Sequence, residues 1–253
     1  MTIVMRTIRR AYTGNMIARV WNAALDILFP PACVACGIKT SATDPYPSFC
    51  THCRESIILR DGFSCPTCGA RIPRVFDRCH PATFPLAAAV SYHGAAAELV
   101  HAAKYRGIAS AIDPMAGMLA AYAAHLVARG EFSFADAALV PIPLHKSRER
   151  ARGYNQARIL AEKTACSLGV DIPVLDALTR IRETAPQIKC QTPGERKQNI
   201  TGAFSCDPCA ILPYRHLIIV DDVATSGATL NEAARALKKA GARHIAGLVF
   251  AKA

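Results

Sequence analysis

The sequence predicts an α/β protein: a parallel sheet flanked by helices, preceded by a small cysteine-rich double zinc ribbon. Two observations carry this prediction. From residue 85 to residue 253, apolar runs of strand length alternate with helix-length segments, which is typical of a parallel sheet covered on both faces. Upstream, cysteines recur as C-x-x-C pairs between Cys33 and Cys79, the spacing of zinc-binding knuckles.

The chain divides into three regions. Residues 1–30 form an N-terminal helical segment, residues 31–84 the double zinc-ribbon region, and residues 85–253 the α/β domain. Within the first region, residues 17–29 predict an amphipathic helix packed on the body of the protein, with a membrane-surface anchor as the alternative. This region has several arginines but no continuous apolar core, so we expect no signal peptide. No charge-free apolar stretch reaches about eighteen residues, so we expect no membrane span.

The charge and the cysteines limit the classes of function. The net charge of +11 favours polyanionic ligands without choosing among sugar phosphates, nucleotides and nucleic acid. Eleven cysteines could form a secreted disulfide framework, but most fall in C-x-x-C pairs and no export signal precedes them. We therefore expect a cytoplasmic protein whose cysteines bind metal.

The first ribbon has a complete set of ligands. Cys33 and Cys36 form one knuckle, Cys50 and Cys53 form the next, and thirteen residues separate them. Four thiolates on two such turns can surround one Zn²⁺ at about 2.3 Å. A redox C-x-x-C is expected singly beside a βαβ unit, which this region lacks. We expect at least one structural zinc ion.

The second ribbon is incomplete. Cys65 and Cys68 form a knuckle, but only Cys79 follows, because Phe76 stands where a further cysteine would complete the pair. Three arrangements fit: a Cys₃His site that uses His80, a metal-free ribbon held by packing, or a site completed from downstream. The residues available for that last arrangement are Cys206 and Cys209.

The elements of the α/β domain follow from periodicity and from glycines that end helices. In order, we expect a strand over 88–92, helices over 95–105 and 114–129, a strand over 137–142, a helix over 155–168, a strand over 216–220, a helix over 228–240 and a strand over 244–251.

A turn rich in small and hydroxyl residues follows the strand over 216–220. It reads Asp221, Asp222, Val223, Ala224, Thr225, Ser226, Gly227, Ala228, Thr229. Small residues let backbone N–H groups close around a phosphate at the start of a helix, and hydroxyls can donate to its oxygens. The two carboxylates suit a sugar diol instead. The turn therefore predicts a site for a phosphorylated sugar, at the carboxyl end of a strand where open α/β sheets bind ligands.

A second basic loop follows the strand over 137–142. It contains two prolines and then Lys146, Arg148 and Arg152, whose spacing allows them to converge on one anion but also suits a solvated surface. The helix that opens after Arg152 carries the segment Gly153, Tyr154, Asn155, Gln156 and Ala157.

These motifs resemble a known family. DDVATSGAT is similar to the phosphoribosyl-pyrophosphate (PRPP) signature of type I phosphoribosyltransferases. The ordered set of paired cysteine knuckles, AAKYRG, PxPLHxxRxxxRGYNQA, RETAPQ and ERKQNITGAF resembles the ComF competence proteins from about residue 29 onward. The cysteine missing at Phe76 is the one clear departure.

The resemblance implies residue roles. Asp221 and Asp222 would hold ribose hydroxyls, residues 225–229 would hold the 5′-phosphate, and the basic loop would face the pyrophosphate. Mg²⁺ would bind with PRPP. A mobile loop would close over the site and would include Arg182, Gln187 and Arg196.

The resemblance also implies a biological setting, DNA uptake or use during competence. Two functions stay open: a PRPP-binding adaptor and an active PRPP-dependent glycosyltransferase with an unidentified base or amine acceptor. Protein partners would come from DNA-uptake or replication-restart machinery. Direct contact with single-stranded DNA is also open, although the knuckles carry few aromatic side chains for base stacking.

Overall fold

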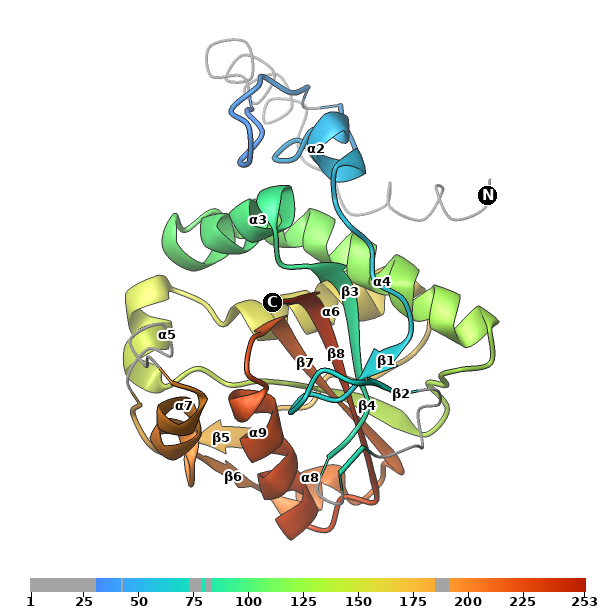
Figure 1. Ribbon diagram of the computed structural model, residues 1–253, viewed down its shortest axis with the longest axis vertical. Helices are drawn as coiled ribbons and strands as arrows, with labels where there is room; N and C mark the ends of the chain where they lie inside the picture. Colours follow the sequence, from blue (N-terminus) through green and yellow to red (C-terminus); the bar gives the residue numbers. More distant parts are fainter. Residues whose placement is uncertain (1–30, 42, 73–78, 81–82, 185–191) are drawn as a thin grey trace, which may run out of the picture.

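The computed structural model describes residues 31–41, 43–72, 79–80, 83–184 and 192–253. The helix expected over residues 17–29 lies outside this part of the chain. The described residues form a mixed α/β structure with a mostly parallel six-stranded sheet (Figure 1).

The sheet has the strand order β2-β1-β3-β8-β7-β4. β3, β8, β7 and β4 run parallel, and β1 and β2 join antiparallel at one edge. A separate two-stranded sheet pairs β5 with β6. The strands are β1 (Phe63–Ser64), β2 (Arg71–Ile72), β3 (Leu86–Ser91), β4 (Ala137–Pro141), β5 (Leu178–Arg180), β6 (Phe204–Cys206), β7 (His216–Ala224) and β8 (His244–Lys252).

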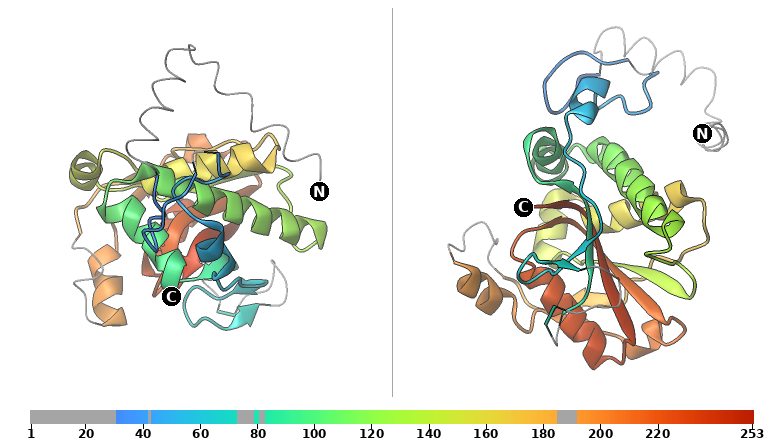
Figure 2. Two further views of the ribbon diagram at one scale, coloured as in Figure 1. Left: turned by 90° about the horizontal axis from the view of Figure 1, so that it is seen from above. Right: turned by 45° about the vertical axis from the view of Figure 1, so that its right-hand side comes forward.

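Helices cover both faces of the large sheet (Figure 2). One core lies between the sheet and α3, α4 and α6, and the other lies between the sheet, α9 and the β5–β6 pair. The helices are α2 (Thr51–Glu55), α3 (Gly94–Tyr105), the short 3₁₀ turn η3 (Ala109–Ala111), α4 (Ile112–Ala128), α5 (Lys146–Arg152), α6 (Gln156–Leu168), α7 (Pro193–Ile200), α8 (Pro208–Ile211) and α9 (Ala228–Lys239).

The second ribbon is built into the large sheet. β1 pairs with β3, with Phe63 opposite Ala87, and β2 pairs with β1. Strands from both sides of the expected domain boundary, between residues 84 and 85, therefore belong to one sheet. That boundary stays a prediction.

The first ribbon sits on helices α3 and α4 instead. Ser48 Oγ donates to the carbonyl of Ser110 at 3.0 Å, and Arg106 Nη2 donates to the carbonyl of Val34 at 2.8 Å. A Cβ at Gly117 of α4 would lie 2.0 Å from the hydroxyl of Tyr46, so a larger residue there would displace this tyrosine. The two ribbons thus contact different parts of the α/β body.

The elements expected in the α/β domain are present, with one difference that matters for the site. We expected the strand before the sugar-phosphate turn to end at residue 220, whereas β7 continues to Ala224. Its extension pairs with β8, with Asp221 opposite Val249 and Ala224 opposite Lys252. Both aspartates therefore lie within the strand, and the turn begins at Thr225.

One helix among the described residues is long and apolar enough to cross a membrane by composition alone. It consists of the turn η3 and the helix α4 that continues it, Ala109–Ala128. Within this window 56% is buried inside the protein, and Leu119 and Leu126 belong to the core. The burial is typical of a core helix.

Candidate phosphoribosyl site and metal centres

A cavity of about 520 Å³ opens where β7 extends beyond its neighbour β4. β4 ends at Pro141, opposite Val220, so the residues of β7 that follow have an open edge on this side. Cavities of this size are typical of small-molecule sites. A smaller cavity of about 240 Å³ lies at the opposite end of these strands, beside His216 and His244, away from the sugar-phosphate turn.

Arginines form the basic side of the larger cavity. Arg148 and Arg152 lie one helical turn apart on α5, and both line the cavity. Arg180 at the end of β5 lines it as well, although it is only 8% exposed. The guanidinium of Arg180 lies 5.5 Å from the ring centre of Phe204, and that of Arg152 lies 5.9 Å from the ring centre of Tyr105.

Thr184 holds two of these arginines in place. Arg148 Nη2 donates to its carbonyl, and Arg180 Nη2 donates to its hydroxyl. Burial and the nearby Arg148 lower the pKa of Arg180 to about 10, because two cations share a poorly hydrated space. Burial and Arg152 lower the pKa of Arg148 in the same way. Such a cluster is complementary to a ligand with several negative charges.

The two aspartates lie in different environments. Asp222 is 4% exposed, and its Oδ1 pairs with Lys104 Nζ of helix α3 at 2.7 Å. Burial disfavours the charged ammonium, but the carboxylates of Asp222 and Asp221 outweigh that effect and raise the pKa of Lys104. Asp222 thus already has a cationic partner.

Among the described residues Asp221 forms no ion pair of its own, although the charge of Lys104 also acts on it. Its Oδ1 accepts from the backbone N–H of Asp222 at 2.9 Å, and its side chain faces the cavity. Burial, and next the charge of Asp222, raise the pKa of Asp221 to about 7. The folded protein thus disfavours the ionised form of Asp221. A ligand that brings hydroxyl donors or a divalent cation would stabilise that form.

The turn after β7 has the features of an anion site. It precedes α9, a helix of twelve residues whose N-terminus faces it. The cavity is lined by Thr225 and Thr229. The hydroxyl of Ser226 is buried without a hydrogen-bond partner among the described residues. Gly227 has a φ of +70°, a backbone conformation that favours glycine.

The segment Tyr154-Asn155-Gln156 supplies both structure and a candidate ligand contact. Tyr154 donates to the carbonyl of Ala103 in α3, and Asn155 caps α6 and donates to the carbonyl of Ile142. Gln156 differs, because it is 2% exposed and its Nε2 has no partner in the described part of the chain. It lines the cavity, where a ligand oxygen could accept this N–H.

Other residues expected at the site lie elsewhere. Lys146 is exposed on α5 and does not line the cavity. Arg182 donates to the carbonyls of Asn199 and Thr201 at 2.8 and 2.6 Å, so it closes the end of α7. Gln187 lies outside the described residues, and of Arg196 the structure describes only the backbone within α7.

Sequence reasoning did not select three side chains of the cavity as site residues. Lys104 and Gln156 were visible only as members of longer motifs, and Arg180 belonged to none of the motifs. The available signal was a polar residue beside buried apolar neighbours, as for Lys104 after Ala102 and Ala103 in α3. A buried polar side chain needs a partner, and for Lys104 that partner is more than a hundred residues away.

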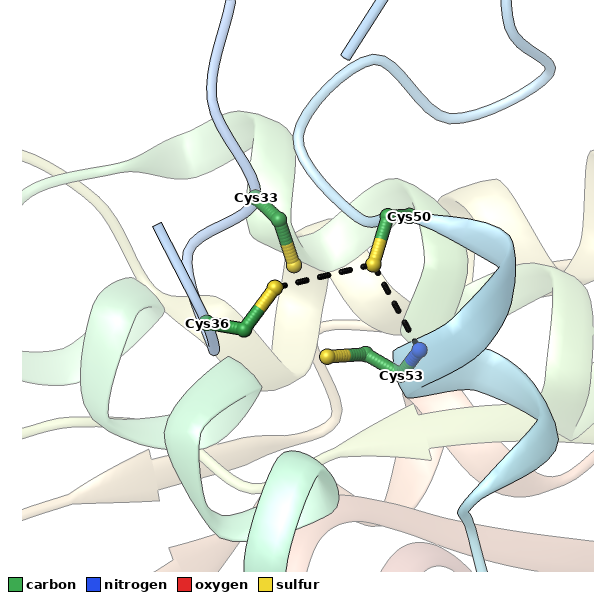
Figure 3. A group of neighbouring side chains, drawn as sticks. All are labelled: Cys33, Cys36, Cys50 and Cys53. Carbon is green, nitrogen blue, oxygen red and sulfur yellow. Dashed lines mark hydrogen bonds between the residues drawn. The ribbon is translucent and has the colours of Figure 1, made fainter. Parts of the chain in front are cut away.

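The first cysteine cluster has the geometry of a zinc site. The four sulfurs of Cys33, Cys36, Cys50 and Cys53 point toward one another and lie within 4.8 Å of one another (Figure 3). Sulfurs around a tetrahedral zinc ion are separated by roughly 3.8 Å, and the Cys36 and Cys50 sulfurs are 3.7 Å apart. The backbone N–H of Cys53 also donates to the sulfur of Cys50.

In the second cluster, His80 stands where a fourth metal ligand is needed. Cys65, Cys68, Cys79 and His80 bring their donor atoms within 4.8 Å of one another. The Cys68 and Cys79 sulfurs are 3.4 Å apart, and His80 Nε2 lies 3.9 Å from the Cys79 sulfur. This favours the Cys₃His arrangement. Among the described residues, neither cluster includes Cys206 or Cys209, and Phe76 lies outside the described part.

Comparison with known families agrees with this architecture. Residues 24–83 match the double zinc ribbon domain, and residues 155–253 match the phosphoribosyl transferase domain. The ribbon match and the two clusters together support structural zinc. The chain is therefore a zinc-ribbon protein with a phosphoribosyltransferase domain.

Individual relatives confirm the ComF resemblance. "Competence protein F" of Haemophilus influenzae is 39% identical over 110 residues, 43% of this chain and 47% of that protein. "DNA utilization protein YhgH" of Escherichia coli is 37% identical over 106 residues, 41% of this chain and 44% of that protein. "Competence protein ComFC" of Bacillus subtilis is 28% identical over 209 residues, 78% and 80% of the two chains. The first two matches span about half the length of those relatives.

Proposed function

We propose that this protein binds PRPP, or a closely related phosphorylated ribose, together with Mg²⁺ in the cavity beside β7. The observation that carries the proposal is a set of buried polar groups without partners among the described residues. Three of the four such atoms belong to the cavity or its loop: Gln156 Nε2, Arg180 Nε and Ser226 Oγ. Leaving such groups unpaired costs about 1–3 kcal/mol each, so a ligand with many acceptor oxygens would stabilise them.

The distribution of charge suggests how such a ligand would lie. The turn over residues 225–229 and the N-terminus of α9 would take the 5′-phosphate. The pyrophosphate would face Arg148, Arg152 and Arg180, where positive charge is concentrated. Asp221 would accept from ribose hydroxyls or hold Mg²⁺, whose chemistry is to neutralise pyrophosphate charge. Lys104 would keep Asp222 oriented beneath the sugar.

The relatives' names suggest the setting. Because matched proteins are called competence and DNA utilization proteins, we propose a role in DNA uptake or use, with partners from that machinery. The cysteines of both clusters must stay reduced to bind zinc, so we propose a cytoplasmic location. Direct contact with single-stranded DNA would involve exposed cations outside the cavity, such as Lys146 and Arg150.

The test is calorimetric titration of the zinc-loaded protein with PRPP and Mg²⁺. We expect saturable binding that Arg152→Gln and Gln156→Leu each weaken, and that ribose 5-phosphate reproduces with lower affinity. Lys146→Gln on the same helix as Arg152, but outside the cavity, is the matched control and should leave the affinity unchanged. Absence of PRPP binding to the wild-type protein would refute the proposal.

A second assay separates a binding protein from an enzyme. The PRPP complex is incubated with a panel of bases and amines, and pyrophosphate release is followed. Release with one acceptor would identify a PRPP-dependent glycosyltransferase. PRPP binding without release for any acceptor would favour the adaptor function.

A further inference from the structure

The second zinc knuckle packs directly against the turn over residues 225–229, which we call the anion loop. A Cβ on Gly227 would lie 2.0 Å from the carbonyl oxygen of Pro66 and 2.8 Å from its carbonyl carbon. The backbones of the two segments are therefore in direct contact, and no larger residue fits at position 227. One helical turn further along α9, Asn231 Nδ2 donates to Thr67 Oγ1 at 3.0 Å.

Pro66 and Thr67 are the two residues between Cys65 and Cys68. Their positions are therefore set by the same turn that presents two thiols to the second cluster. The turn is closed by the N–H of Gly69, which donates to the carbonyl of Cys65 at 2.9 Å, and by the N–H of Thr67, which donates to the Cys65 sulfur. A metal that joins these thiols to Cys79 and His80 would hold this turn against α9.

The sheet fixes the other side of the knuckle. Ser64 precedes Cys65 and pairs with Leu86 of β3, so the knuckle cannot move as a free domain. Pro66 itself is buried. A rigid edge strand on one side and a metal cross-link on the other leave the Pro66 carbonyl little freedom, and Gly227 lies against that carbonyl.

The first cluster offers a natural contrast. Its segment contacts the end of α3, the turn η3 and the helix α4 through Val34, Ser48 and Tyr46. The two clusters share ligand chemistry and local C-x-x-C geometry, but they adjoin different parts of the body.

We propose that metal at the second cluster positions the anion loop, so that zinc binding there and PRPP binding at residues 225–229 strengthen each other. Pro66 and Thr67 are the positioning residues, and the inference rests on the proposed PRPP site. Coupling between two sites is reciprocal, so the factor by which zinc improves PRPP affinity is the factor by which PRPP improves zinc affinity.

The test compares Cys68→Ser with Cys36→Ser in the full chain. Both cysteines are exposed, and each is the second thiol of its own knuckle. Each variant should retain one zinc ion instead of two by elemental analysis. We expect Cys68→Ser to weaken PRPP binding by about tenfold, within the range typical of coupled sites. Cys36→Ser should change it less than about twofold, and Cys68→His, which restores a ligand, should recover the affinity.

Because the coupling is reciprocal, it can also be measured as zinc release from the wild-type protein. PRPP with Mg²⁺ should slow zinc release to a chelator from one of the two sites, by about the same factor, and leave the other unaffected. Equal effects of PRPP on both ions, or equal loss of PRPP affinity in Cys36→Ser and Cys68→Ser, would overturn the inference.

Amide hydrogen exchange keeps this inference separate from the proposed function. Without any ligand, exchange of the peptide that covers residues 223–231 should speed up in Cys68→Ser but not in Cys36→Ser. If the wild type bound no PRPP, the proposed function would fail while this exchange result still decided whether the knuckle positions the loop. Unchanged exchange in Cys68→Ser would reject the positioning role.

Discussion

The buried pair between Lys104 and Asp222 makes the sharpest prediction about stability. Asp222→Asn keeps the size of the side chain but leaves the Lys104 ammonium beside a neutral amide. Breaking a fully buried ion pair typically costs about 3–5 kcal/mol. The side chain of Lys104 is 23% exposed, and that of Asp222 is 6% exposed, so the ammonium keeps some access to water. We therefore expect a loss of about 2 kcal/mol.

Thermal unfolding measures this loss. For a chain of this size, about 1 kcal/mol lowers the midpoint by roughly 2–4 °C, so Asp222→Asn should unfold about 4–8 °C below the wild type. Lys104→Met should also destabilise, because it leaves a buried carboxylate alone. The double variant should be more stable than the sum of the single losses predicts, by about 1 kcal/mol or more. Additive losses, or no loss in Asp222→Asn, would show that the pair does not stabilise the fold.

Three further predictions concern the neighbouring groups. Asp221→Asn should raise the thermal midpoint at pH 8, because it removes a carboxylate whose folded pKa is raised to about 7 by burial and by Asp222. The gain should shrink as the pH falls through 7 and vanish below 3.8, where the group is protonated in both folded and unfolded protein; a pH-independent difference would contradict this assignment. His80→Phe should lower the zinc content from two ions per chain to one, whereas a content unchanged by the substitution would exclude His80 as a ligand. Gly227→Ala should lower both PRPP affinity and the thermal midpoint, since its Cβ would meet the Pro66 carbonyl, and wild-type values for both would show that the loop and knuckle are not in contact.

Much of the fold could be predicted from the sequence because its signals are local. The short elements α5, β5, α7, β6 and α8 were not expected, whereas the longer strands and helices of the α/β domain follow from apolar periodicity and from glycines after the helices, and they lie close to their expected bounds. The exception is β7, whose last four residues include two aspartates with little intrinsic preference for strands. They are extended because β8 continues alongside them, a contact that no local pattern encodes.

The site was predictable only in part, for the same reason. Asp221 and the hydroxyl turn are contiguous in the sequence, so they could be selected together. Lys104 and Arg180 reach the cavity from α3 and β5, and only the packed structure brings them to it. The contact between Pro66 and Gly227 joins residues that belong to two separate motifs. The knuckle that contains Pro66 is placed by β1, which pairs with β3. A strand of two residues has no periodicity from which it could be predicted.

A crystal structure of the zinc-loaded protein with PRPP and Mg²⁺ tests the central proposal most directly. We predict a 5′-phosphate on the backbone N–H groups of residues 226–229 and ligand oxygens within hydrogen-bond distance of Gln156 Nε2 and Arg180. A ligand bound elsewhere on the protein, with those buried donors still unpaired, would contradict the assignment of this cavity.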